Sequence, residues 1–366
     1  MTLIAKIVVS LLILDTGNWL GIRWLLLLIL IFGAVKSSDL IFSKSVINFF
    51  LMLIGSLIFF NLPSVYIAVS SDIPVNEIIP RTFWILYLPT LIVLFYFNSV
   101  DDSYLPFVSN FLSLFVIALF IGTELNLDVF VSLHGYLKSD PDYGYFNDTF
   151  SIFGVVGKGY YFKFALLFSV FCIYSLRKRF FYTFLFSFAA LIISDTKLGI
   201  LMVLLFLLYE SVSRLRPANV LVLVITSFLF YVYIDAAAVL GDISLGVFAR
   251  LSHFDPIIDN FTIINFFLGS GPGSGFFAES FGFFTRDSEI SQLEFIRRYG
   301  FISFIVFTVS IMLLISKRYY YLLGALWVIC LSNPIIISSP VLVFYSILIS
   351  SLLHEKKSKL HFSDPL

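Results

Sequence analysis

The side chains best suited to chemistry in this sequence are basic residues that lie beside long apolar runs. Lys197 follows Ser-Asp-Thr in the short connection between two such runs, and Arg250 opens a long polar segment. Ionisable groups beside membrane spans usually face a bundle interior or a water-filled cavity, and Arg binds phosphate through paired hydrogen bonds. Both residues are therefore candidates for a functional site. An Asp195–Lys197 pair closing the turn, or a surface ion pair of Arg250 with Asp255 or Asp259, is the alternative.

A second group of charges lies near residues 285–300. The pattern predicts an amphipathic helix near 287–299 that leads into an apolar span, with Asp287 or Ser288 as its N-cap and Glu289 in its first turn. Capping explains the acidic residues, but it does not explain the basic residues close to them. These are Arg286, Arg297 and Arg298.

Residues 268–275 read Leu-Gly-Ser-Gly-Pro-Gly-Ser-Gly. This is not a P-loop, because no Gly-Lys-Ser/Thr follows it. Backbone N–H groups around Gly271 and Gly273 would suit an anion-binding nest, and a flexible linker is the alternative.

His253 is the one histidine besides His134 outside the C-terminal tail. An isolated His serves packing more often than catalysis. No cluster of His, Cys and Glu has metal-ligand spacing, so we expect no metal site and no cofactor.

The elements that must position these residues are membrane helices. Hydrophobic residues make up 60% of the 366-residue chain and charged residues 13%, and the mean hydropathy is +1.00. A soluble domain is roughly 45–50% apolar and about 25% charged. This composition excludes a soluble enzyme and a secreted disulfide scaffold. The net charge of zero gives no basic excess for nucleic acid.

The apolar runs predict an all-α fold: a polytopic integral membrane helical bundle of about 12 transmembrane helices (range 10–12), forming one domain over residues 1–366. The predicted spans are 2–20, 22–36, 45–62, 81–98, 105–122, 160–176, 180–195, 197–212, 218–240, 301–316, 319–333 and 340–353. Two connections, 123–159 and 241–300, are much longer than the rest, and their composition indicates ordered loops or interfacial helices.

Basic residues in short loops predict the orientation, because they resist translocation. With twelve spans, all the basic clusters fall on one side, which places both termini in the cytoplasm and both long loops outside. The clusters are Lys36 with Lys44, residues 177–179, Arg214 with Arg216, residues 317–318, and the tail. Snorkelling to headgroups accounts for Arg23 and Arg81.

Four features within residues 190–315 together resemble the O-antigen polymerase (Wzy) family, which is related to the O-antigen ligases. They are Ser194-Asp-Thr-Lys197 in a span, Arg250 at the start of a long loop, the turn 268–275, and the run from Asp287 to Phe301. Related sequences often carry Arg where this chain has Lys197. Ligase-type members place a His before the last amphipathic helix, where this chain has Asp287-Ser-Glu289, and this difference favours a polymerase.

The resemblance implies a metal-independent glycosyl transfer at the periplasmic face of the bacterial inner membrane. The reaction would join oligosaccharide repeat units carried on undecaprenyl pyrophosphate, with membrane lipid and a chain-length-determining co-polymerase as partners and no nucleic acid. A flippase for the same lipid-linked sugars and an O-antigen ligase are the alternatives.

The resemblance also implies roles for the candidate residues. Arg250 and Lys197 would hold the donor pyrophosphate, with Arg286, Arg297 and Arg298 in second rank and Gly271 and Gly273 as a backbone nest. Asp287 and Glu289 would bind or activate the acceptor hydroxyl, with His253 in reserve. Lys158 and Lys163, at the end of the first long loop, would close the site.

Overall fold

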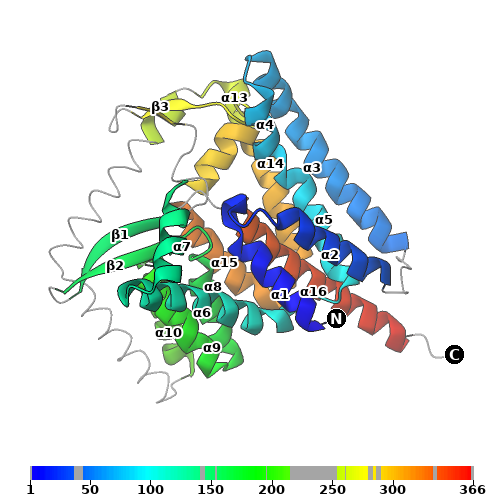
Figure 1. Cartoon of the computed structure of the whole chain (residues 1–366). Coiled ribbons are helices and arrows are strands. Elements are labelled where there is room, and N and C mark those ends of the chain that lie inside the picture. Colours follow the sequence, from blue (N-terminus) through cyan, green and yellow to red (C-terminus); the bar gives the residue numbers. More distant parts are fainter. Residues whose placement is uncertain are drawn as a thin grey trace.

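A computed structural model of the chain describes residues 2–36, 44–140, 145–152, 155–194, 196–214, 254–259, 261–278, 283–285, 290–332 and 336–363. These residues form a mostly helical protein with two short β-hairpins (Figure 1). By length and apolar composition, four of the described stretches qualify as membrane-spanning: Met52–Ser70, Val75–Phe97, Asp102–Glu124 and Ser291–Leu314. The chain thus has the helical, apolar character of an all-α membrane protein, while the twelve spans remain a prediction.

The elements are named as in Figure 1. The helices are α1 (Thr2–Leu14), α2 (Arg23–Lys36), α3 (Lys44–Ser70), α4 (Val75–Thr82), α5 (Trp84–Phe97), α6 (Leu105–Glu124), α7 (Asp128–Lys138), α8 (Leu167–Lys178), α9 (Phe181–Ile193), α10 (Lys197–Arg214), α13 (Ile263–Leu268), α14 (Ser291–Leu314), α15 (Tyr320–Ile329) and α16 (Ser339–Ser363). The strands are β1 (Tyr145–Ile152), β2 (Val155–Phe162), β3 (Phe276–Ala278) and β4 (Phe283–Thr285).

Most predicted spans coincide with a helix, and the spans at 218–240 and 160–176 are the two exceptions. The span at 218–240 lies outside the described residues. The span at 160–176 is part strand and part helix, because β2 continues to Phe162 and α8 begins only at Leu167.

The described part of the first long loop contains the helix α7 and the hairpin of β1 and β2. Strands β1 and β2 pair antiparallel with Tyr145 opposite Phe162. The aromatic side chains of β2 pack on α6, where the Tyr160 ring meets Phe120 at 5.6 Å and the Phe162 ring meets Phe115 at 5.8 Å. Aromatic residues favour strands when one face is buried, and α6 supplies that buried surface.

The turn between α1 and α2 satisfies the carbonyl groups at the end of α1 with side chains. Trp19 Nε1 donates to the Leu14 carbonyl at 2.9 Å, and Arg23 Nη2 donates to the Asp15 carbonyl at 2.5 Å. Arg23 therefore closes a helix end, a role that a purely snorkelling side chain would not have. The Asp15 carboxyl lies in this turn, outside both helices, where burial raises its pKa although the Leu20 amide and Arg23 act against the shift.

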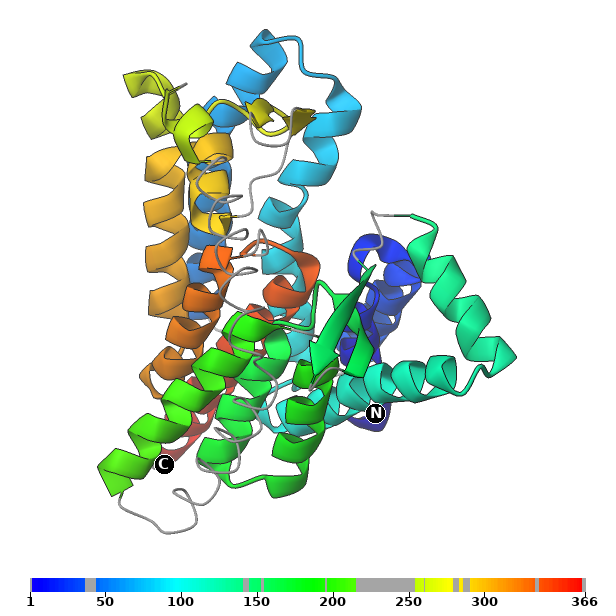
Figure 2. The ribbon, with the colours of Figure 1, turned by 90° about the vertical axis from the view of Figure 1, so that its left-hand side faces the viewer.

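The glycine-rich segment and the short α13 meet the upper ends of α3 and α14. Figure 2 shows α14 running alongside α3, and Figure 1 shows α4, α13 and β3 gathered at the same end. Segments from three distant parts of the sequence therefore come together there.

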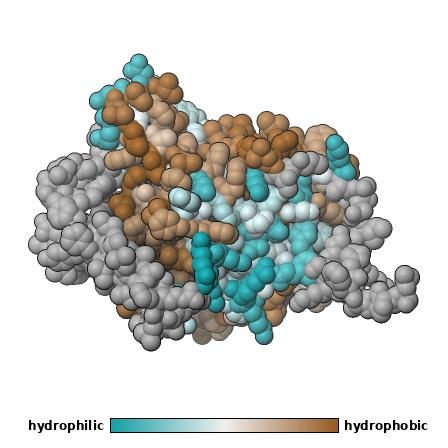
Figure 3. Space-filling view, turned by 90° about the horizontal axis from the view of Figure 1, so that it is seen from below, coloured by the Kyte–Doolittle hydropathy of each residue, from teal (hydrophilic) through white to brown (hydrophobic). Residues whose placement is uncertain are grey.

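A polar cluster surrounds Asp102, which begins the short 3-10 helix Asp102–Tyr104 before α6. Lys178 Nζ and Arg318 Nη2 each approach its carboxylate at 3.5 Å, and the Tyr174 hydroxyl donates to Oδ2 at 3.2 Å. Arg318 also pairs with Glu355 on α16. Lys178 and Arg318 belong to two basic clusters that the sequence predicts on the same side of the membrane. Both approach the carboxylate of Asp102. The lower face of the molecule carries a hydrophilic patch bordered by hydrophobic surface (Figure 3).

Replacing the central carboxylate, Asp102→Ala, is expected to destabilise the protein by about 1–2 kcal/mol, because two half-exposed cations and a buried tyrosine lose their shared acceptor. The measurement is the thermal unfolding midpoint of the detergent-purified chain. The exposed Asp72, changed to Asn, serves as the control and should leave the midpoint unchanged. Equal midpoints for the two variants would show that the cluster contributes no stability.

Candidate functional site

Glu294 binds two arginines on one face of α14. Its carboxylate receives a two-pronged interaction from Arg297, with Nε–Oε2 at 2.9 Å and Nη2–Oε1 at 2.7 Å, and an ion pair from Arg298. Spacings of three and four residues place all three side chains on the same face of a helix. Only 5% of Glu294, 4% of Arg297 and 7% of Arg298 is exposed, so this is a buried Arg–Glu–Arg triad.

The triad is different from the amphipathic surface helix that the sequence predicts. Helix α14 begins at Ser291 with Ile290 in extended backbone as its N-cap, and Glu294 is the acidic residue of its first turn. Asp287 and Ser288 are therefore not the N-cap, and Glu289 is not in the first turn. The charged side chains of this turn are buried because they neutralise one another, which hydropathy alone does not reveal.

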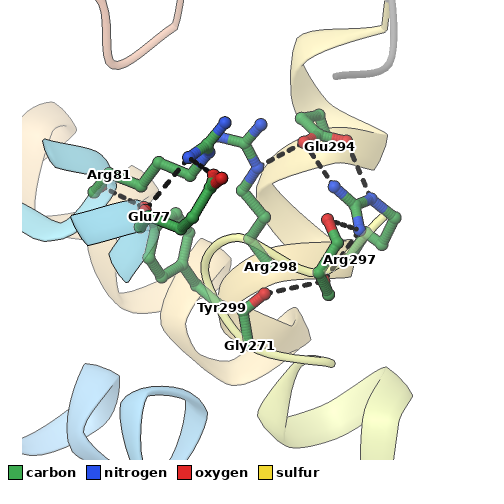
Figure 4. A network of polar contacts seen from close by, with 8 residues as sticks. Glu77, Arg81, Gly271, Glu294, Arg297, Arg298 and Tyr299 are labelled. Atoms are coloured by element: carbon green, nitrogen blue, oxygen red, sulfur yellow. Dashed lines mark hydrogen bonds and ion pairs between the residues drawn. The ribbon is translucent and has the colours of Figure 1, made fainter. Parts of the chain in front are cut away.

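The glycine-rich loop binds to the triad through its backbone. Arg297 Nη1 donates to both the carbonyl and the hydroxyl oxygen of Ser274, each at 2.8 Å. In return, the Ser270 and Gly271 amides donate to the Arg297 and Arg298 carbonyls, at 2.7 and 3.2 Å. The Gly271 amide that the sequence suggests for an anion thus binds α14 instead. Figure 4 shows these groups around the end of the loop.

A kink at Gly300 explains why those carbonyl groups accept hydrogen bonds from the loop. Gly300 has φ +87° and ψ 160° inside α14, so the regular helical hydrogen-bond ladder is interrupted there. A Cβ at this position would lie 2.2 Å from the Phe267 carbonyl oxygen. Only glycine permits both the positive φ and this close approach.

The loop is wedged between α14 and the connection from α3 to α4. Gly271 has φ +95°, and a Cβ there would lie 2.8 Å from Ala68 Cα. Gly273 lies against Ile73 and Glu77 in the same way. The segment is therefore a packed connector, which differs from the flexible linker that its composition suggests.

Arg81 on α4 joins this cluster, although the sequence gives it only a snorkelling role. Its Nη1 pairs with Glu77 Oε2 at 2.8 Å, and the Tyr299 hydroxyl donates to its carbonyl oxygen. Figure 4 shows Arg81 and Glu77 together with the triad and Tyr299. The Arg81 and Glu77 side chains are 22% and 21% exposed, so Arg81 is the accessible cation of the cluster.

Among the residues that the structure describes, five charged side chains form this site: Glu77, Arg81, Glu294, Arg297 and Arg298. We call them the arginine cluster. Three guanidinium groups against two carboxylates give it one net positive charge. Three guanidinium groups gathered in a mostly buried region with one excess positive charge favour an anion. The chemistry that this arrangement suits is binding of a phosphate or diphosphate.

An apolar groove of about 440 Å³ lies beside the bend at Gly300. It lies between α3 and α14, and Ser303 Oγ, which donates to the Phe60 carbonyl at 2.6 Å, connects its two walls. Leu268 and Ile302 bring the groove to the Gly300 kink, and no residue of the arginine cluster lines it. The lining residues are Phe59, Phe60, Leu62, Pro63, Tyr66, Leu268 and Ile302.

The remaining predicted site residues are not brought to the arginine cluster by what the structure describes. Lys197 is the first residue of α10, Lys158 lies opposite Thr149 in the hairpin, and Lys163 is half-buried in the turn after β2. Arg250, His253, Arg286, Asp287 and Glu289 lie outside the described residues. Of the predicted set, Arg297, Arg298, Gly271 and Gly273 meet in one place.

Among the described residues, no three His, Cys, Asp or Glu side chains are grouped so that they could hold a metal ion. Comparison with known proteins gives no relative: no family model matches the chain, and neither a curated protein nor a solved structure matches it.

Glu294→Gln is expected to destabilise the protein by about 3–5 kcal/mol, because it leaves two buried arginines without their carboxylate. The matched control is Glu355→Gln, whose partner Arg318 has a 45% exposed side chain. That change should cost less than about 1 kcal/mol. Chemical unfolding in mixed micelles measures both, and similar losses for the two variants would contradict a buried triad.

Gly300→Ala is expected to cost about 3 kcal/mol or more, since alanine at this φ meets the Phe267 carbonyl. Gly324→Ala in α15 is the control, because nothing lies within 4 Å of its added Cβ. Thermal unfolding should show a large drop for the first variant and no drop for the second. A Gly300→Ala protein as stable as the control would mean that α14 is not kinked there.

Proposed function

We propose that the protein is a membrane glycosyltransferase that polymerises lipid-linked oligosaccharides, as the O-antigen polymerases do. The observation that carries this proposal is that the arginine cluster and an apolar groove both lie at the Gly300 bend of α14, with Arg297 and Arg298 before the bend and Ile302 of the groove after it. Undecaprenyl pyrophosphate has the two matching parts, a long apolar chain and a doubly phosphorylated end. A groove between α3 and α14 suits the first part, and adjacent guanidinium groups suit the second.

In this reaction the anomeric carbon of the donor sugar exchanges its bond to pyrophosphate for a bond to the acceptor hydroxyl. Negative charge grows on the leaving pyrophosphate in the transition state. Preorganised guanidinium groups in a region of low dielectric stabilise that charge. Arg81, the accessible cation, would contact the pyrophosphate. The buried Arg297 and Arg298 would add positive charge to its surroundings.

Glu294 and the glycine-rich loop would act as positioning groups in this site. A guanidinium held by two hydrogen bonds to Glu294 and two to Ser274 keeps its orientation, so little ordering is left to be done when the anion binds. The burial of the triad thus has a functional reason beyond stability.

The deprotonation of the acceptor hydroxyl requires a base, and the proposal gives this role to Asp287 or Glu289, with His253 in reserve. Arg250, Lys197 and Arg286 would add cations at the pyrophosphate, and Lys158 and Lys163 would close the site. These assignments are supported by the family resemblance alone. The periplasmic side, the cytoplasmic termini and a co-polymerase partner belong to the same proposal.

The test is reconstitution of the purified chain in proteoliposomes with lipid-linked repeat units, followed by separation of the products by length. We expect a ladder of polymers from the unmodified protein. Arg81→Ala should lower the rate by about 10²–10³-fold, on the scale of losing one oxyanion donor. Arg81→Lys should retain part of the activity, because it keeps the charge but not the paired hydrogen bonds.

Lys138→Ala is the control, since it removes an exposed cation of α7 that has no part in the site. A normal ladder from Arg81→Ala at equal protein abundance would exclude Arg81 from the site. Movement of the lipid-linked sugar across the bilayer without any polymer would instead identify a flippase.

A further inference from the structure

A second apolar groove lies between α1 and α2, and the proposed function makes no use of it. Its volume is about 220 Å³, and it shares no lining residue with the groove between α3 and α14. Its lining is apolar except at one end, where a cation and an amide are found. The lining residues are Ile4, Ala5, Ile29, Leu30, Phe32, Gly33, Lys36 and Asn98.

Small residues and a fixed backbone account for the hollow. Ala5 and Gly33 take up little space where the first turn of α1 meets the last turn of α2. The Asn98 amide donates to the Leu30 carbonyl at 2.9 Å and to the Leu94 carbonyl at 2.8 Å, so it ties α2 to the end of α5. The groove is therefore held open by a specific hydrogen-bonded contact.

The walls of the groove face outward. Ile4 is 59% and Phe32 is 73% exposed. Both lie in spans that the sequence predicts, 2–20 and 22–36, where such exposed apolar side chains would contact acyl chains. An acyl chain lying between these two side chains would cover apolar surface that the protein itself leaves open.

Lys36 determines which kind of lipid fits. It is exposed in the last turn of α2, and among the described residues that line the groove none is acidic. A Lys at the polar end of an apolar channel matches a phosphate at the head of an acyl chain. A lipid with a net negative headgroup gains more from this contact than a zwitterionic lipid, whose own cation competes with Lys36.

We propose that the α1–α2 groove is a binding site for an anionic phospholipid, with one acyl chain between Ile4 and Phe32 and the headgroup phosphate on Lys36. Binding joins α1, α2 and the end of α5 through one ligand, so an occupied site stabilises the folded chain. The site is separate from the arginine cluster, and its occupancy does not depend on the reaction that the protein performs.

The experiment uses the full chain, purified in detergent and stripped of lipid. Phosphatidylglycerol and phosphatidylcholine with identical acyl chains are titrated in, and bound lipid is counted by native mass spectrometry alongside the thermal midpoint. We expect tighter binding of phosphatidylglycerol, and a midpoint that rises with its concentration.

Lys36→Gln should weaken phosphatidylglycerol binding about fivefold and leave phosphatidylcholine unchanged. Lys317→Gln, which removes another exposed lysine from a basic connection, should bind both lipids like the unmodified chain. Gly33→Leu fills the groove and should weaken binding of both lipids, while Lys36→Gln keeps the test valid if Gly33→Leu folds poorly.

Three results would overturn the proposal. The first is equal affinity of the unmodified chain for both lipids. The second is equal loss in Lys36→Gln and Lys317→Gln, which would indicate general charge attraction. The third is equally tight binding of glycerol phosphate alone, which would exclude any role for the acyl chain.

Discussion

The burial of two guanidinium groups beside a single carboxylate is the constraint on which this end of the molecule depends. Removing three charges from water costs several kcal/mol for each ion unless their hydrogen bonds are replaced. Glu294 replaces part of them, and Ser274 supplies two more acceptors for Arg297. The glycine-rich loop must therefore lie against α14, and its close packing excludes side chains at Gly271. The position of the loop follows from that electrostatic requirement, and the kink at Gly300 leaves the carbonyl groups of Arg297 and Arg298 to accept hydrogen bonds from it.

Hydropathy predicts the helices well because a chain in lipid must satisfy its backbone hydrogen bonds within each span. The apolar runs at 105–122 and 197–212 match α6 and α10 closely. Hydropathy does not predict the hairpin of β1 and β2. Its Tyr and Phe residues resemble the start of a span, and only packing on α6 distinguishes strand from helix there.

The candidate site was predictable in part. The pair Arg297-Arg298 stands out in the sequence because no topology rule requires it, and the spacing of Glu294 makes a triad on one helical face foreseeable. Arg81 does not stand out, because the contact that brings it in joins residues far apart in the chain, through Tyr299. The sequence does not predict the burial of the triad either, because neighbouring charged residues are ordinarily found at a protein surface.

The fixed elbow at Gly300 makes the length of the preceding segment as important as its residues. Each residue of an α-helix advances the direction of its side chain by about 100°. Inserting or deleting one residue between Glu294 and Arg297 would leave the elbow in place on α13 and turn the Glu294 carboxylate away from Arg297 and Arg298. Among related chains, this segment should therefore keep its length as strictly as it keeps its charged residues and its glycine.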